Sequence, residues 1–172
     1  MATIDDYGSE PPRRASPEHR IAFQGRPGAY SHMACRIHYP ELEPLPCHSF
    51  EDAFAAVREG EARYAMIPVD NSVAGRVADV HHLLPRGGLH IVAEHFLRVN
   101  HQLLGIPGAT LETVRVVESH VHAIGQCREF LRRHGYQARV VADTAGAAAD
   151  VAAAADRSRA AIASRLAAEI YG

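Results

Sequence analysis

Short apolar runs alternate along this chain with longer stretches in which apolar residues recur at helical spacing. The apolar runs predict strands at residues 20–24, 44–48, 64–69, 114–118, 138–142 and 160–163. The periodic stretches predict helices at residues 29–38, 50–59, 76–84, 121–134, 144–155 and 164–171. Because strands and helices alternate in this order, the pattern predicts an α/β fold with mainly parallel sheets covered by helices.

One extended run, residues 89–106, breaks this alternation because it has no helix caps. We interpret it as strands that cross between two lobes. The predicted organisation is therefore a first lobe at residues 20–98 and a second lobe at residues 99–172. Residues 1–19 hold three prolines and many charges with little to bury, and they predict a disordered leader.

Polar side chains follow several of the predicted strands. The apolar run 64–69 leads directly into Asp70, Asn71 and Ser72, and polar residues also follow the strands that end near residues 24, 118 and 142. In open α/β sheets, ligands bind beyond the carboxyl ends of the strands. The helices that follow have N-terminal N–H groups and dipoles that favour an anion, so this edge would suit a carboxylate ligand. The alternative for any single junction is that the polar residue only caps the next helix.

Composition narrows the class of protein. The chain has 172 residues, of which 47% are hydrophobic and 22% charged, and its net charge of −2 argues against binding to nucleic acid. Three cysteines without a CxxC pair favour a reduced, cytoplasmic protein, and no apolar run is long enough to cross a membrane. Paired histidines at 81–82 and at 120 and 122 do not complete a metal motif, so we expect no metal site.

Five motifs in chain order resemble those of the prephenate dehydratase family. They are GRPGAYS at 25–31, IPVDNSVAGRV at 67–77, SHVHAIGQC at 119–127, DTAGAA at 143–148 and AAIASRLAAEIYG at 160–172. The resemblance implies a two-lobed, periplasmic-binding-protein-like fold of type II with the active site in the cleft between the lobes. It also implies a lyase of L-phenylalanine biosynthesis that converts prephenate to phenylpyruvate, carbon dioxide and water without a cofactor, as a homodimer.

The matching positions give the predicted site. The predicted catalytic residues are Asp70, Asn71, Ser72, Ser119 and Gln126. The predicted substrate-binding residues are Gly28, Ala29, Tyr30, Ser31, Gly75, Asp143 and Thr144, and Thr144 is also expected to cap the helix that follows it. Two positions depart from the family pattern, because Asp70 stands where the family usually has glutamate and Val121-His122 stand where it often has Pro-Gln.

A third departure concerns a whole motif. The family's Thr-Arg-Phe motif, whose threonine is the leading candidate for the general acid, does not occur in these 172 residues, and neither does the regulatory ACT domain. We therefore expect an incomplete catalytic domain. The alternative function is a non-catalytic, bilobed module, derived from this enzyme, that binds a small carboxylate.

Overall fold

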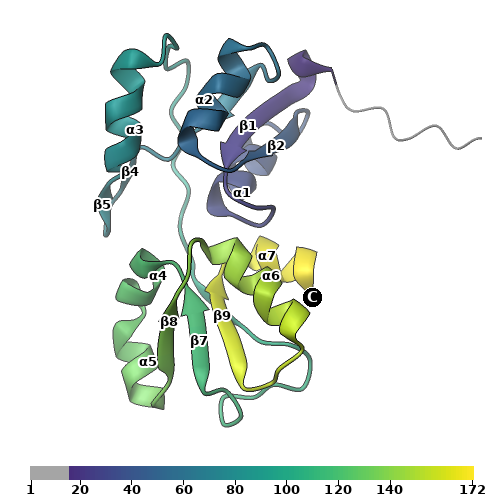
Figure 1. Cartoon of the computed structure of the whole chain (residues 1–172), viewed down its shortest axis with the longest axis vertical. Helices are drawn as coiled ribbons and strands as arrows, with labels where there is room; N and C mark the ends of the chain where they lie inside the picture. The colour runs from purple at the N-terminus through teal and green to yellow at the C-terminus, as the bar shows by residue number, and fades with distance from the viewer. Residues whose placement is uncertain (1–15) are drawn as a thin grey trace, which may run out of the picture.

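The computed structural model describes residues 16–172, which form two α/β lobes, one above the other in Figure 1. The predicted leader lies outside the described residues up to position 15. Its described remainder contains a short 3-10 helix, η1 (Pro17–His19), that leads into the first strand. No helix in residues 16–172 is long and apolar enough to span a membrane.

The first lobe is built on a three-stranded parallel sheet. Its strands are β1 (Arg20–Gln24), β2 (Glu43–Cys47) and β3 (Tyr64–Met66), in the order β2-β1-β3. Helices α1 (Tyr30–His38) and α2 (Phe50–Arg58) pack on it. The central strand is buried on both faces, because Ile21 and Phe23 pack against Cys35 of α1 while Ala22 packs against Ala53 of α2.

A small hairpin follows β3, between the strand predicted at residues 64–69, which ends early at Met66, and the helix predicted at residues 76–84. It pairs β4 (Asp70–Asn71) with β5 (Gly75–Arg76) in antiparallel register. Helix α3 (Ala78–Leu83) and the 3-10 helix η2 (Leu84–Arg86) come next. The idea that Asn71 or Ser72 caps a helix is wrong, because Val77 is the N-cap of α3.

The second lobe has a four-stranded sheet in the order β6-β9-β7-β8. Its strands are β6 (Gln102–Leu104), β7 (Val116–Ser119), β8 (Gln137–Val140) and β9 (Arg159–Ala163), with β6 antiparallel to β9 and the other pairs parallel. Its helices are α4 (Val121–Gln126), α5 (Arg128–His134), α6 (Thr144–Ala154) and α7 (Arg165–Tyr171). The buried Glu118 pairs with Arg159 at 2.7 Å and with Arg139 at 3.2 Å, which joins β7 to both neighbouring strands.

Two predicted elements differ in the structure. The predicted helix 121–134 is interrupted at Cys127, whose φ of −98° and ψ of 8° leave the helical region just after Gly125, a weak helix former. The predicted crossing strands at 89–106 are wrong except for β6. A strand requires a partner, and this part of the described chain has none until β6 meets β9. Ile91 and Phe96 are accordingly 71% and 85% exposed.

The carboxyl ends of the central strands of both sheets point toward the junction of the lobes. Figure 1 shows β1 running downward from the first lobe and β7 and β9 running upward from the second. The mainly parallel sheets thus bring the polar segments after β1, β7 and β9 to the same region, as expected for a fold of this class.

Candidate active site

The loop between β1 and α1 docks on the second lobe. Ser164 Oγ donates a hydrogen bond of 2.5 Å to the carbonyl oxygen of Gly28, and Tyr171 OH donates one of 2.8 Å to that of Pro27. Gly28 has a φ of +92°, and a Cβ on it would lie 2.8 Å from Ala167 Cα, so only glycine fits. Gly28 therefore lies at the contact between the lobes, which is a structural role in addition to the binding role predicted for it.

The first turn of α1 follows this loop and has no side-chain cap. Its N-cap, Ala29, has a methyl side chain that cannot accept a hydrogen bond, and the side chains of Tyr30 and Ser31 do not cap the helix. The N–H group of Gly28, just before the helix, donates to His32 Nδ1 at 2.9 Å. Burial, followed by the nearby Arg36, lowers the pKa of His32, which keeps Nδ1 available as an acceptor. The uncapped N–H groups and the helix dipole favour an anion at this turn.

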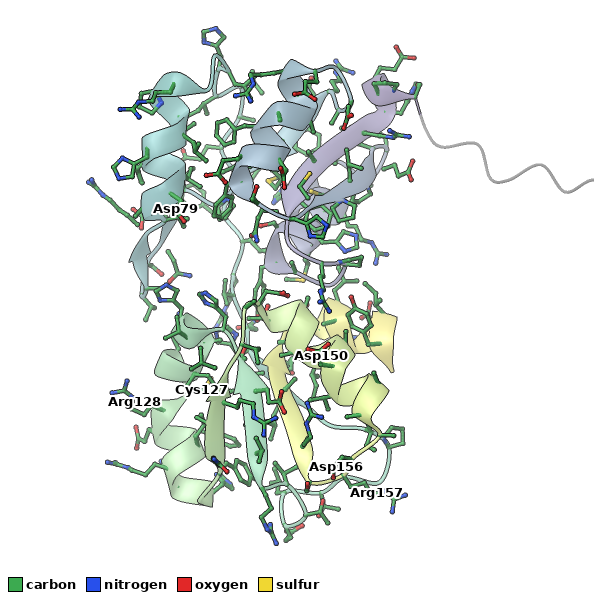
Figure 2. All side chains as sticks on the ribbon, in the orientation of Figure 1. Asp79, Cys127, Arg128, Asp150, Asp156 and Arg157 are labelled. Atoms are coloured by element: carbon green, nitrogen blue, oxygen red, sulfur yellow. The ribbon has the colours of Figure 1, made fainter. Side chains whose placement is uncertain are left out.

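A chain of hydrogen bonds connects this turn to the second lobe. Tyr30 OH lies 2.9 Å from His101 Nδ1 and 3.1 Å from the carbonyl oxygen of Asn100, and His101 Nε2 lies 3.1 Å from Gln126 Oε1. Burial raises the pKa of Tyr30, with a further contribution from Cys127. Cys127 marks the junction of α4 and α5 in Figure 2.

Within this chain, Tyr30 and Gln126 are predicted site residues that the fold brings together, and His101 is a residue that sequence reasoning missed. His101 stands in a segment predicted only as extended. It shows no motif, and its two partners are 71 and 25 residues away. No local signal in the sequence could have identified this residue.

Ser119 lies elsewhere. It is fully buried at the end of β7, and its Oγ donates a 2.5 Å hydrogen bond to the carbonyl oxygen of Ile162 in β9. His120, not Ser119, is the N-cap of α4. In the described structure no hydrogen bond joins Ser119 to Gln126, so the fold does not pair these two predicted residues.

The predicted residues around Asp70 belong to the β4–β5 hairpin, and their hydrogen bonds are local. Asp70 Oδ1 accepts from the N–H of Asn71 at 2.8 Å, and Asn71 Oδ1 accepts from the N–H groups of Val73 at 2.9 Å and Ala74 at 2.8 Å. Ser72 is exposed in the turn, and Gly75 has a φ of +84°. In Figure 1 the hairpin extends from the first lobe toward α4, but no hydrogen bond or ion pair of the described residues joins it to the second lobe.

Asp143 and Thr144 begin α6. Asp143 is the N-cap, and its Oδ1 accepts from the N–H of Gly146 at 2.6 Å. The expectation that Thr144 caps this helix is wrong, because Thr144 is its first helical residue. A carboxylate already occupies this helix end, so α6 is less suited to an anionic ligand than the uncapped α1.

Two small pockets on the described surface are not lined by the candidate residues. One of these lies between α2 and α3 and includes Phe54, Leu83 and Gly87. The other lies beside α6 and α7 and includes Leu104, Val151 and Tyr171. In residues 16–172, no group of three or more histidine, cysteine, aspartate or glutamate side chains is placed to hold a metal ion.

Comparison with known proteins identifies the family of this chain. The family model for prephenate dehydratase matches residues 21–172. The chain belongs to the prephenate dehydratase family. It is 45% identical over 153 residues to the arogenate dehydratase/prephenate dehydratase 1, chloroplastic, of Arabidopsis thaliana, covering 89% of this chain and 39% of that protein.

One further relative in sequence and one solved structure are similar to this chain. The chain is 50% identical over 155 residues to a bifunctional N-acyl-homoserine lactone acylase/prephenate dehydratase of Komagataeibacter europaeus, covering 90% of this chain and 55% of the relative. A solved prephenate dehydratase from Arthrobacter aurescens, in complex with L-Phe, has a TM-score of 0.81 and 28% identity over 88% of this chain and 52% of that one. The two-lobed fold of the family, which resembles type II periplasmic binding proteins, is therefore confirmed for this chain, and the chain spans only about half of these relatives.

Proposed function

We propose that this domain binds prephenate between its lobes and takes part in its conversion to phenylpyruvate, as a lyase of amino-acid biosynthesis. The observation that carries the proposal is the hydrogen-bonded chain from the uncapped first turn of α1 through Tyr30 and His101 to Gln126. It joins a site for an anion on one lobe to an exposed amide on the other. The predicted cytoplasmic homodimer belongs to the same proposal.

The reaction requires little from the protein. The bond from the ring to its carboxylate breaks, the electron pair enters the ring, and the ring hydroxyl leaves as water after it takes up a proton. Aromatisation drives this sequence, so the protein has to hold two carboxylates in position and deliver one proton. The N–H groups of the α1 turn and the side-chain amides of Asn71 and Gln126 are neutral donors suited to carboxylates.

Neutral donors also fit the alternative of a non-catalytic module that binds a small carboxylate. Calorimetry with prephenate and an absorbance assay for phenylpyruvate separate the two functions. Binding with turnover supports the dehydratase, binding without turnover supports the module, and the absence of both contradicts the proposal. Arogenate is the second substrate to assay, because the relative from Arabidopsis thaliana is named as an arogenate dehydratase as well as a prephenate dehydratase.

Gln126→Glu tests the role of the side-chain amide most directly, because it keeps the size of the side chain and removes its N–H donor. We expect prephenate affinity to fall about 10-fold or more, the usual cost of a lost hydrogen bond to a charged group. Gln137→Glu is the matched control, since it makes the same chemical change at an exposed position. Gln137 lies at the start of β8, the end of the sheet that is away from the junction of the lobes. Equal losses in both variants would indicate general charge repulsion.

A second candidate activity is hydrolysis of N-acyl-homoserine lactones. The observation that favours it is the name of the 50% identical relative from Komagataeibacter europaeus. Release of homoserine lactone from an N-acyl substrate would support it. If Gln126→Glu abolished prephenate binding but left this release unchanged, the two activities would use different residues.

A further inference from the structure

His101 lies between the two lobes, just before β6, and both of its ring nitrogens are engaged. Its ring is half-buried and meets the ring of Tyr30 edge-on, with centroids 5.6 Å apart and an interplanar angle of 74°. Nδ1 faces the Tyr30 hydroxyl at 2.9 Å, and Nε2 faces Gln126 Oε1 at 3.1 Å. His101 is therefore fixed from the first lobe on one side and contacts a predicted site residue on the other.

The partners determine which nitrogen carries the proton. An amide oxygen can only accept a hydrogen bond, so the contact with Gln126 Oε1 requires the proton on Nε2, which then donates to that oxygen. Burial lowers the pKa of His101, which favours the neutral ring, and Nδ1 of that ring is an acceptor. The Tyr30 hydroxyl, whose own pKa is raised by burial, stays protonated and can donate to it.

This arrangement has a consequence for Gln126, which is exposed. The terminal torsion of a glutamine side chain is broad and roughly two-fold, so a free amide presents its oxygen about as readily as its nitrogen. Since His101 engages Oε1, the N–H2 group is left to donate, and it makes no hydrogen bond to the described residues. A carboxylate ligand needs this donor and is repelled by the oxygen.

We propose that His101 is a positioning residue, held by Tyr30, that fixes the side-chain amide of Gln126 with its N–H2 group directed to the ligand. The proposal rests on the proposed function, because it takes the ligand to be a carboxylate. His101 itself exchanges no proton with the substrate. Its effect is to select one of two amide orientations before binding.

The role of His101 can be tested first on the free protein, without a ligand. Nitrogen-15 NMR of the histidine rings should report His101 as the Nε2–H tautomer, and Gln126→Ala should change the His101 signals. An Nδ1–H tautomer, or no response to Gln126→Ala, would overturn the proposal whatever the protein binds. The proposed function is judged separately, by prephenate binding to the unmodified chain.

Variants then test the effect on binding. His101→Phe keeps a ring and removes both nitrogens, and we expect prephenate affinity to fall about 5- to 20-fold, within the range for a hydrogen bond to a charged group. His101→Gln retains an N–H donor and should recover most of that loss. In a Gln126→Ala background, His101→Phe should have no further effect. A loss of equal size in both backgrounds would mean that His101 only supports the fold, and the proposal would be wrong.

Discussion

The β4–β5 hairpin and the junction of the lobes both carry predicted site residues, but they use their polar groups differently. In the hairpin, Asn71 bonds to the backbone two and three residues along the chain. At the junction, Tyr30 and Gln126 bond to His101, which is distant from both in the sequence. The hairpin is therefore a locally determined loop, whereas the junction exists only when both lobes are folded.

This difference separates two kinds of site residue. A residue whose oxygen is already used in a turn has a structural role and can offer a ligand only its remaining groups, such as the Nδ2 of Asn71. A residue held by another lobe is positioned by the tertiary structure, so its mutation should affect binding more than local stability. Substitutions in the two regions should therefore separate losses of stability from losses of ligand affinity.

The largest effect is expected from adding a methyl group at Gly28. Gly28→Ala combines a positive φ with a clash against Ala167, so we expect a loss of about 2 to 5 kcal/mol in the free energy of unfolding. Gly75→Ala is the matched control, since its φ is also positive but a Cβ there has nothing within 4 Å, and it should cost only about 1 to 2 kcal/mol. Urea unfolding measures both. Equal costs would show that Gly28 makes no close contact with the second lobe.

Ser119→Ala should have the next largest effect. It removes the hydroxyl that donates to the carbonyl oxygen of the buried Ile162, so we expect a loss of about 1 to 3 kcal/mol in stability. Gln126→Ala, at an exposed position, should change stability by less than about 0.5 kcal/mol while lowering prephenate affinity. If instead Ser119→Ala left stability unchanged and weakened binding, Ser119 would contact the ligand directly.

Much of the fold could be predicted from the sequence, because apolar alternation reports which residues face a sheet or a helix. The strands β1, β2, β7, β8 and β9 and the helices α1, α2 and α6 lie within one or two residues of their predicted ranges. The hairpin was missed because each of its strands has only two residues. The break at Cys127 was missed because the apolar face continues across it.

The site was less predictable for a physical reason. Motifs identify residue types, so Tyr30 and Gln126 could be named from the sequence, but which atoms meet depends on contacts between lobes. Ser119 is a residue that a motif identifies but whose hydroxyl is used within the sheet. It lies in a motif at a strand end, yet the parallel pairing of β7 with β9 brings its hydroxyl to a backbone carbonyl inside the sheet.

The third prediction separates the turn from the ligand at Asn71. Asn71→Ala removes the acceptor of two backbone N–H groups and should cost about 1 kcal/mol in stability. Asn71→Asp keeps that acceptor but replaces the amide donor with a charge, so it should preserve stability and still weaken prephenate binding about 10-fold or more. Thermal unfolding and calorimetry provide the two measurements. Normal binding by Asn71→Asp would restrict Asn71 to its role in the turn.

The smallest effect is expected from pH, and it should act at the junction but not in the hairpin. Burial lowers the pKa of His32, whose ring stacks on Phe23 and whose Nδ1 accepts from the N–H of Gly28. Because the folded-state pKa is below the unfolded value of about 6.5, the unfolded state binds more protons in this range, and stability falls as the pH falls below about 6.5.

A protonated Nδ1 of His32 also cannot accept a hydrogen bond from the N–H of Gly28. After correction for intrinsic exchange rates, amide hydrogen exchange at Gly28 should therefore accelerate on acidification, while exchange at Ala74, which donates to the uncharged Asn71 side chain, should not. His32→Asn offers a non-titrating acceptor near the position of Nδ1 and should remove the acceleration at Gly28. Equal acceleration at Gly28 and Ala74 would mean that the two regions respond to acid as one unit, and persistence of the acceleration at Gly28 in His32→Asn would mean that His32 does not cause it.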